Sequence, residues 1–128
     1  MIDESELPIL KVHYPMNGTP AQFVAVWDEY CRIARANDRV VYLLDMRYAS
    51  PMSAPAKVRR LAADLYQKYR HVLAPSAVCE ARIVSNELIR GAITAFDWIK
   101  GDHLWPCRTF TDEAQARAWV EAQLRAEK

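Results

Sequence analysis

The feature that most constrains the fold is a short apolar run that stops at an acid. Residues 40–44 read Val-Val-Tyr-Leu-Leu, and the next residue is Asp45. A run of this length, rich in β-branched and aromatic residues, is typical of a strand buried on both faces. We therefore expect residues 40–45 to form the central strand of a sheet, with residues 45–53 at its exit.

Strand-like and helix-like segments alternate along the chain. The expected strands lie within residues 7–14, 40–45, 77–85 and 105–110. Each is followed by apolar residues at helical spacing. Such alternation with short connections predicts a mainly parallel sheet joined by crossover helices. The sequence thus predicts a single small α/β domain over residues 1–128, with about four mainly parallel strands alternating with four helices and a flexible N-terminus at residues 1–6.

Two helix starts carry capping residues. Residues 19–22, Thr-Pro-Ala-Gln, form a capping box with proline at the first helical position. The next helix follows two prolines, so we expect it to begin with Ser53 as its N-cap. This second helix contains Lys57 and is the most basic element of the chain. Its charges are spread and interrupted by Asp64, which favours a solvated face over a nucleic-acid interface.

Bulk composition excludes several classes of protein. Hydrophobic residues make up 52% of the chain, which excludes disorder as its main state, and the net charge is +1. A charge this small gives no attraction to nucleic acid or to an anionic membrane. No apolar run approaches the roughly 18 residues of a membrane span, and the acidic start does not resemble a secretory signal. With three widely spaced cysteines, these features predict a cytoplasmic protein.

No catalytic motif stands out. The three histidines are far apart and lack metal-ligand spacing, and there is no G-x-S-x-G turn. The three glycines are not clustered, so they do not form a phosphate cradle for a nucleotide. The sequence therefore predicts neither a metal nor a cofactor.

The exit of the central strand is the candidate ligand or partner site. In open α/β sheets, ligands bind outside the carboxyl ends of the strands. The polar residues expected there are Asp45, Arg47, Tyr48, Ser53 and Lys57. Asp45 can instead cap a turn or pair with a neighbouring base. Ser53 is either a simple N-cap or a phosphorylation site, because a helix N-terminus favours a phosphate.

A second candidate surface is aromatic. Trp98 falls off the apolar stripe of its helix, and Leu104 and Trp105 lie in a loop. If these three residues are exposed, they form an apolar interface for a homodimer or a partner protein. The alternative is that they cover the end of the sheet.

Three segments resemble the SpoIIAA-like branch of the STAS domain superfamily, sometimes described as STAS/SEC14-like. They are the strand ending in an acid at residues 41–45, the third strand through residues 82–84, and the sequence TFTDEAQARAWV at residues 109–120. The resemblance spans most of the chain and implies a SpoIIAA/STAS-like fold.

STAS-like domains are generally non-catalytic and bind proteins, or occasionally small ligands, near the start of the helix after the second strand. In anti-sigma antagonists that helix begins with Asp-Ser followed by glycine, and the serine is phosphorylated. Residues 50–55 here lack both the Asp-Ser pair and the glycine, and Ser53 is the nearest analogue by position.

Two functions follow from these observations. The resemblance implies a non-catalytic STAS-like protein-interaction or regulatory module that binds a partner protein or a second copy of itself. The alternative is a small-molecule-binding domain or an unrecognised enzyme that uses the crevice at the carboxyl end of the strand at residues 40–45.

Overall fold

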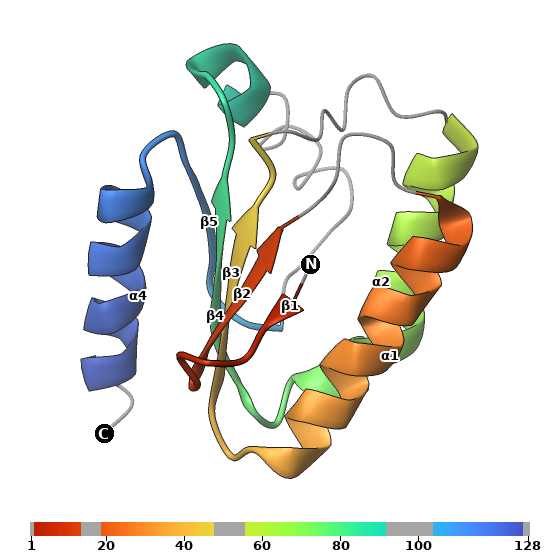
Figure 1. Cartoon of the computed structure of the whole chain (residues 1–128), viewed down its shortest axis with the longest axis horizontal. Helices are drawn as coiled ribbons and strands as arrows, with labels where there is room; N and C mark the ends of the chain where they lie inside the picture. Colours follow the sequence, from red (N-terminus) through yellow and green to blue (C-terminus); the bar gives the residue numbers. More distant parts are fainter. Residues whose placement is uncertain (1, 14–18, 48–55, 92–103, 127–128) are drawn as a thin grey trace.

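Five strands form one mixed sheet in the computed structural model, which describes residues 2–13, 19–47, 56–91 and 104–126 (Figure 1). In spatial order they are β1 (Ile2–Asp3), β2 (Ile9–His13), β3 (Val40–Asp45), β4 (Ala77–Ile83) and β5 (Cys107–Phe110). β1 pairs antiparallel with β2, and each later neighbour is parallel. β3 lies at the centre, and all its residues are buried, as the apolar run predicts.

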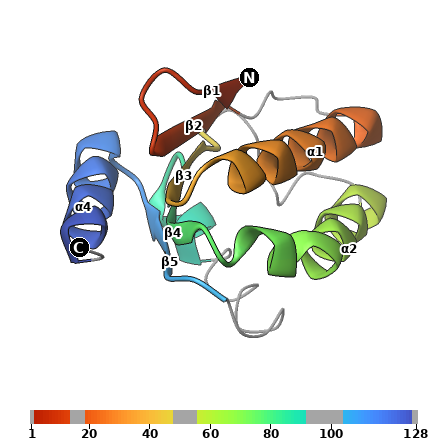
Figure 2. The same cartoon turned by 90° about the horizontal axis from the view of Figure 1, so that it is seen from below.

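Helices cover both faces of this sheet. α1 (Pro20–Ala36) and α2 (Ala56–Leu73) lie on one face, and α4 (Glu113–Ala126) lies on the other (Figure 2). A further helical stretch is described at residues 87–91. Strands β2, β3 and β4 follow one another in the sheet as in the chain. Right-handed crossovers that step in one direction place their helices on the same face, which explains the positions of α1 and α2.

The strand alternation creates two separate apolar layers. Leu10, Val12 and Tyr42 face α1 and α2, where they pack with buried helix residues such as Ile33. The other face of the sheet packs against α4 through a second set of buried residues, which includes Val41, Leu43, Ile83, Phe110 and Val120. Because β3 contributes to both layers, it has no polar face.

The capping box at the start of α1 is confirmed. The Thr19 hydroxyl accepts a hydrogen bond from the Gln22 backbone N–H at 3.2 Å, and the Gln22 side chain accepts from the Thr19 N–H at 2.8 Å. Two of the free N–H groups at the helix start are thereby satisfied. At the other end, Asn37 donates from its side chain to the Ile33 carbonyl at 2.9 Å.

The structure corrects the predicted number of strands. Residues 2–3 form β1 at the edge of the sheet, so the sheet has five strands and not four. In the turn that follows, Glu4 pairs with Arg32 of α1 at 2.9 Å. Glu6 pairs with Arg117 of α4 at 2.9 Å. This turn therefore contacts helices on both faces of the sheet.

The predicted N-cap of α2 stays a prediction. α2 is described from Ala56 to Leu73, and Ser53 lies outside the described residues. Among the helices that the structure describes, none combines the length and apolar character that a membrane crossing requires.

Candidate functional site

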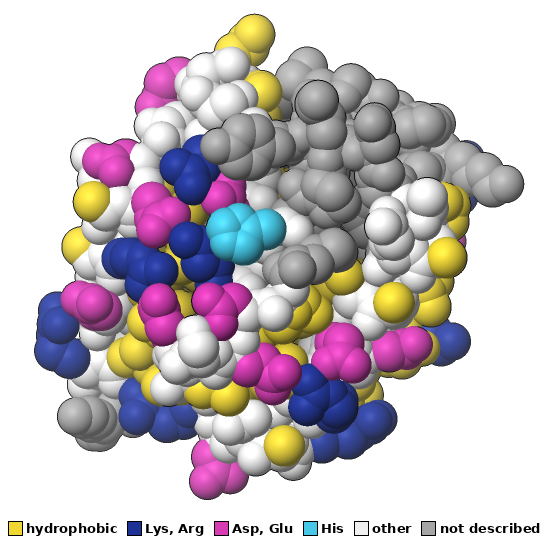
Figure 3. Space-filling view, in the orientation of Figure 1, with side chains coloured by type: hydrophobic (Ala, Val, Ile, Leu, Met, Phe, Trp, Pro, Cys, Tyr) yellow, Lys and Arg dark blue, Asp and Glu magenta, His cyan; other side chains and the backbone are white. Residues whose placement is uncertain are grey.

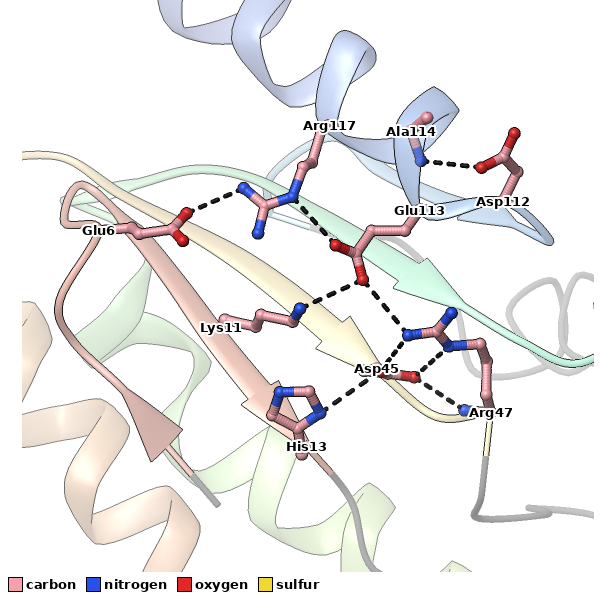
Figure 4. A network of polar contacts seen from close by, with 9 residues as sticks. All are labelled: Glu6, Lys11, His13, Asp45, Arg47, Asp112, Glu113, Ala114 and Arg117. Carbon is pink, nitrogen blue, oxygen red and sulfur yellow. Dashed lines mark hydrogen bonds and ion pairs between the residues drawn. The ribbon is translucent and has the colours of Figure 1, made fainter.

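The carboxyl ends of β2 and β3 meet beside the first turn of α4. His13 and Asp45 are register partners, and side chains two residues apart on a strand share a face. Lys11 and His13 therefore face the same side as Asp45, which is the α4 side. Seven charged or titratable side chains gather here in what we call the strand-exit network (Figure 4): Glu6, Lys11, His13, Asp45, Arg47, Glu113 and Arg117.

Asp45 is the buried acid of the strand-exit network, with 1% of its side chain exposed. Arg47 donates from Nε to Oδ1 at 2.9 Å and from Nη2 to Oδ2 at 2.7 Å, and its backbone N–H donates to Oδ1 at 3.2 Å. These hydrogen bonds hold the pKa of Asp45 below its ordinary value despite the opposing effect of burial. Asp45 therefore carries a negative charge that is neutralised within its own turn.

Glu113 is the second acid of the network and lies at the first residue of α4. It contacts Lys11 Nζ at 3.2 Å, Arg47 Nη2 at 3.3 Å and Arg117 Nε at 3.2 Å. The hydrogen bond from Lys11 is the main cause of its lowered pKa, and the bond from Arg117 adds to it. A carboxylate in the first turn of a helix is also favoured by the helix dipole. Glu113 thus joins β2, the β3 exit and α4 through three cations.

His13 is one of five network residues that the sequence did not single out as site residues; the others are Glu6, Lys11, Glu113 and Arg117. Its Nδ1 lies 3.4 Å from Asp45 Oδ2, and 51% of its side chain is exposed. Figure 4 shows the other ring nitrogen directed away from Asp45. His13 and Asp45 are far apart in the chain, and only the β2–β3 register brings them together. A prediction of which β2 residue lies opposite the last residue of β3 would have identified the pair.

The opposite face of the sheet carries a second polar cluster, centred on Glu80. Its carboxylate accepts from Arg82 Nε at 2.7 Å, from Trp105 Nε1 at 3.3 Å and from Cys107 Sγ at 3.4 Å. The Trp105 ring also packs edge-on against Tyr66 with 5.8 Å between ring centroids. Polar and aromatic contacts thus fix the Trp105 ring over the sheet.

This position removes Trp105 from the candidate interface. The residue is only 4% exposed, so it covers the sheet, which is the alternative that the sequence left open. Leu104 beside it is 43% exposed, and Trp98 lies outside the described residues. The patch of three residues expected from the sequence is therefore reduced to Leu104 in the described part of the chain.

The remaining predicted site residues are only partly located. Tyr48 and Ser53 lie outside the described residues. Lys57 is the second residue of α2, and its side chain is not among those described. Asp45 and Arg47 are the predicted pair that the structure brings together. Their contact matches the alternative in which Asp45 pairs with a neighbouring base.

The network has limited chemical freedom. Asp45 has both oxygens engaged, and Glu113 has three cations around it, so each carboxylate holds a fixed position rather than awaiting a proton. Within the described ranges, no group of three or more His, Cys, Asp or Glu side chains is arranged to hold a metal ion.

No protein-family model matches the chain, and no curated protein or solved structure compared with it matches either.

Proposed function

We propose that this chain is a non-catalytic STAS-like regulatory module that binds a partner protein at the strand exit. The observation that carries the proposal is the mutual pairing of charges in the strand-exit network. Asp45 is neutralised by Arg47, and Glu113 is surrounded by Lys11, Arg47 and Arg117. Carboxylates that are paired with cations in this way hold the surrounding side chains in fixed positions on the surface. The resemblance of three segments to the SpoIIAA-like group supports the same reading.

The charged side chains of the strand-exit network are held in place before a partner binds, which favours recognition of a partner protein. The Arg47 side chain is 36% exposed and is held by two hydrogen bonds to a buried acid. A partner that binds it does not have to immobilise a flexible arginine, which lowers the entropic cost of association. Acidic and basic side chains alternate on the face of the molecule seen in Figure 3. Alternating charges favour a partner of complementary pattern and disfavour others.

The first test is affinity capture with variants of the full chain. Immobilised wild-type protein is incubated with a lysate of its native host, and bound proteins are identified by mass spectrometry. We expect a partner that wild type retains and that Arg47→Gln loses. Arg90→Gln is the matched control, because Arg90 is an exposed arginine paired with Glu87 on a different element. The interaction is then confirmed by titrating the purified partner.

Folding of Arg47→Gln is checked by circular dichroism, and Arg47→Lys provides a second variant that keeps the charge and loses the paired hydrogen bonds. Capture of the same proteins by wild type and both Arg47 variants would contradict the proposal. Mass spectrometry of the same samples also tests whether Ser53 is phosphorylated. An unmodified Ser53 would remove the serine switch and leave partner binding in place.

Self-association is a further part of this proposal. The exposed Leu104 is an apolar contact available for a second copy, while Trp105 is not. Sedimentation velocity over a range of concentrations distinguishes a dimer from a monomer. A monomer at the highest concentration would remove the homodimer.

One observation favours the second candidate, a ligand-binding or catalytic role. His13 is held against a buried acid while half of its side chain remains in solvent.

A further inference from the structure

His13 combines a buried carboxylate on one side of its ring with solvent on the other. Nδ1 lies 3.4 Å from Oδ2 of Asp45, and Asp45 is 1% exposed. A carboxylate that faces Nδ1 favours the tautomer with the proton on that nitrogen. The lone pair then lies on Nε2, which Figure 4 shows directed away from Asp45. The ring is therefore oriented as a nucleophile.

We propose that His13 accepts a phosphoryl group on Nε2. The phosphoryl class is favoured by the surrounding cations, since ammonium and guanidinium groups stabilise the oxygens of a transferring phosphoryl group. Lys11 shares the face of β2 with His13, and Arg47 binds the same carboxylate that His13 contacts. This role goes beyond the proposed partner binding and does not depend on it.

The acids near the site are already engaged. Asp45 is bound by Arg47, and Glu113 by Lys11, Arg47 and Arg117. Asp3, which lies opposite Lys11 in the β1–β2 register, accepts two hydrogen bonds from Ser5. The outermost acid of the network, Glu6, pairs with Arg117. Lys11, Arg47 and Arg117 thus balance Glu6, Asp45 and Glu113, so the network carries no net negative charge that would repel an anionic phosphoryl donor.

The transfer step is a simple displacement, written here for phosphoramidate as the donor. The Nε2 lone pair attacks phosphorus, a new N–P bond forms, and the bond from phosphorus to the donor nitrogen breaks. Ammonia leaves with that bonding pair. The ring becomes cationic, and its charge lies against the Asp45 carboxylate, as an imidazolium is stabilised by a buried acid in a hydrolase triad. Release of the Nδ1 proton to water restores the neutral ring.

The experiment uses the full chain with potassium phosphoramidate. Intact-mass spectrometry follows the gain of one phosphoryl group, and phosphorus NMR with peptide mapping gives the residue and the ring nitrogen. We expect a single phosphoryl group on Nε2 of His13. His13→Gln should lose the label completely, whereas His71→Gln should keep it. His71 is the matched control because it is an exposed histidine on α2.

Asp45→Asn tests the positioning role of the acid. If Asp45 orients the ring, this variant gives a mixture of Nδ1 and Nε2 isomers, a readout that a purely structural change would not move. If Asp45→Asn does not fold, the proposal is still tested by wild type alone, because the phosphoryl group must then be found on Nε2 of His13. The proposal would be overturned if wild type took up no phosphoryl group, or if the group were found on Nδ1 of His13. It would also be overturned if His71 were labelled as fast as His13. None of these outcomes would alter the partner-capture result.

Discussion

At the scale of single residues, Asp45 shows how a polar residue ends an apolar strand. Its carboxylate is buried because Arg47, two residues later, folds back and donates two side-chain hydrogen bonds. A buried carboxylate without such partners would be strongly destabilising. The sequence predicted where the acid lies. It left open whether the acid is free or paired, because pairing depends on how the chain turns after β3.

Loss of this carboxylate should weaken the fold. We expect Asp45→Asn to lower the free energy of unfolding by about 2 kcal/mol, the scale of hydrogen bonds to a charged group. Urea denaturation followed by circular dichroism measures the change. Asp64→Asn is the control, since Asp64 is exposed on α2 and should leave the urea midpoint unchanged. Equal midpoints for Asp45→Asn and wild type would show that the pair does not stabilise the fold.

The same carboxylates predict how stability depends on pH. Asp45 and Glu113 have lowered pKa values in the folded protein, so the unfolded chain binds their protons more readily. Their contribution to stability is fully present above the unfolded-state pKa values of about 4 and is lost as the pH falls through the folded-state values. The urea midpoint of wild type should therefore fall below about pH 4. A smaller fall is expected for Asp45→Asn, and equal slopes for the two proteins would contradict the assignment.

At the scale of elements, what could be predicted from the sequence depends on local signals. The period of apolar residues located β2, β3, β4, α1 and α4, because strands and helices repeat at different spacings. β1 was missed because two residues are too short to show a period. The contact of His13 with Asp45 was also missed, since register between distant strands leaves no local signal. The covered position of Trp105 depended in the same way on long-range packing with Tyr66.

The capping box of α1 gives a prediction at this scale. Thr19→Ala removes the acceptor for the Gln22 N–H, which should cost about 1 kcal/mol of stability. Thr19→Ser keeps the hydroxyl and should stay close to wild type. Chemical denaturation of the three proteins under identical conditions makes the comparison. If the alanine and serine variants lose the same stability, the cap contributes nothing and the effect comes from the lost methyl group.

At the scale of the whole molecule, the sheet separates two apolar layers. Ile33 lies in the layer beneath α1 and α2, whereas Val120 lies in the layer beneath α4. Their side chains belong to different clusters of buried residues. Mutational effects at separate sites usually add to within about 0.5 kcal/mol, whereas effects at contacting sites do not.

We therefore expect Ile33→Val and Val120→Ala to add in the double variant to within about 0.5 kcal/mol. The control pair is Tyr30→Leu with Tyr42→Leu, because these rings are 5.3 Å apart in one layer. For the control pair, the change in the free energy of unfolding of the double variant should differ from the sum of the two single changes. A double-mutant cycle from urea denaturation measures both, and strong coupling between Ile33 and Val120 would show that the sheet transmits packing changes from one layer to the other.

The order of strands in the sheet, which repeats their order in the chain, has a consequence for synthesis on the ribosome. Each new strand pairs with the one made just before it, so the growing chain extends its sheet stepwise without a long-range search. α4 emerges after all five strands, and until it docks, the sheet residues that it covers, such as Leu43 and Ile83, remain open to solvent. This domain is therefore most exposed to aggregation and to chaperones in the interval between the synthesis of β5 and the docking of α4.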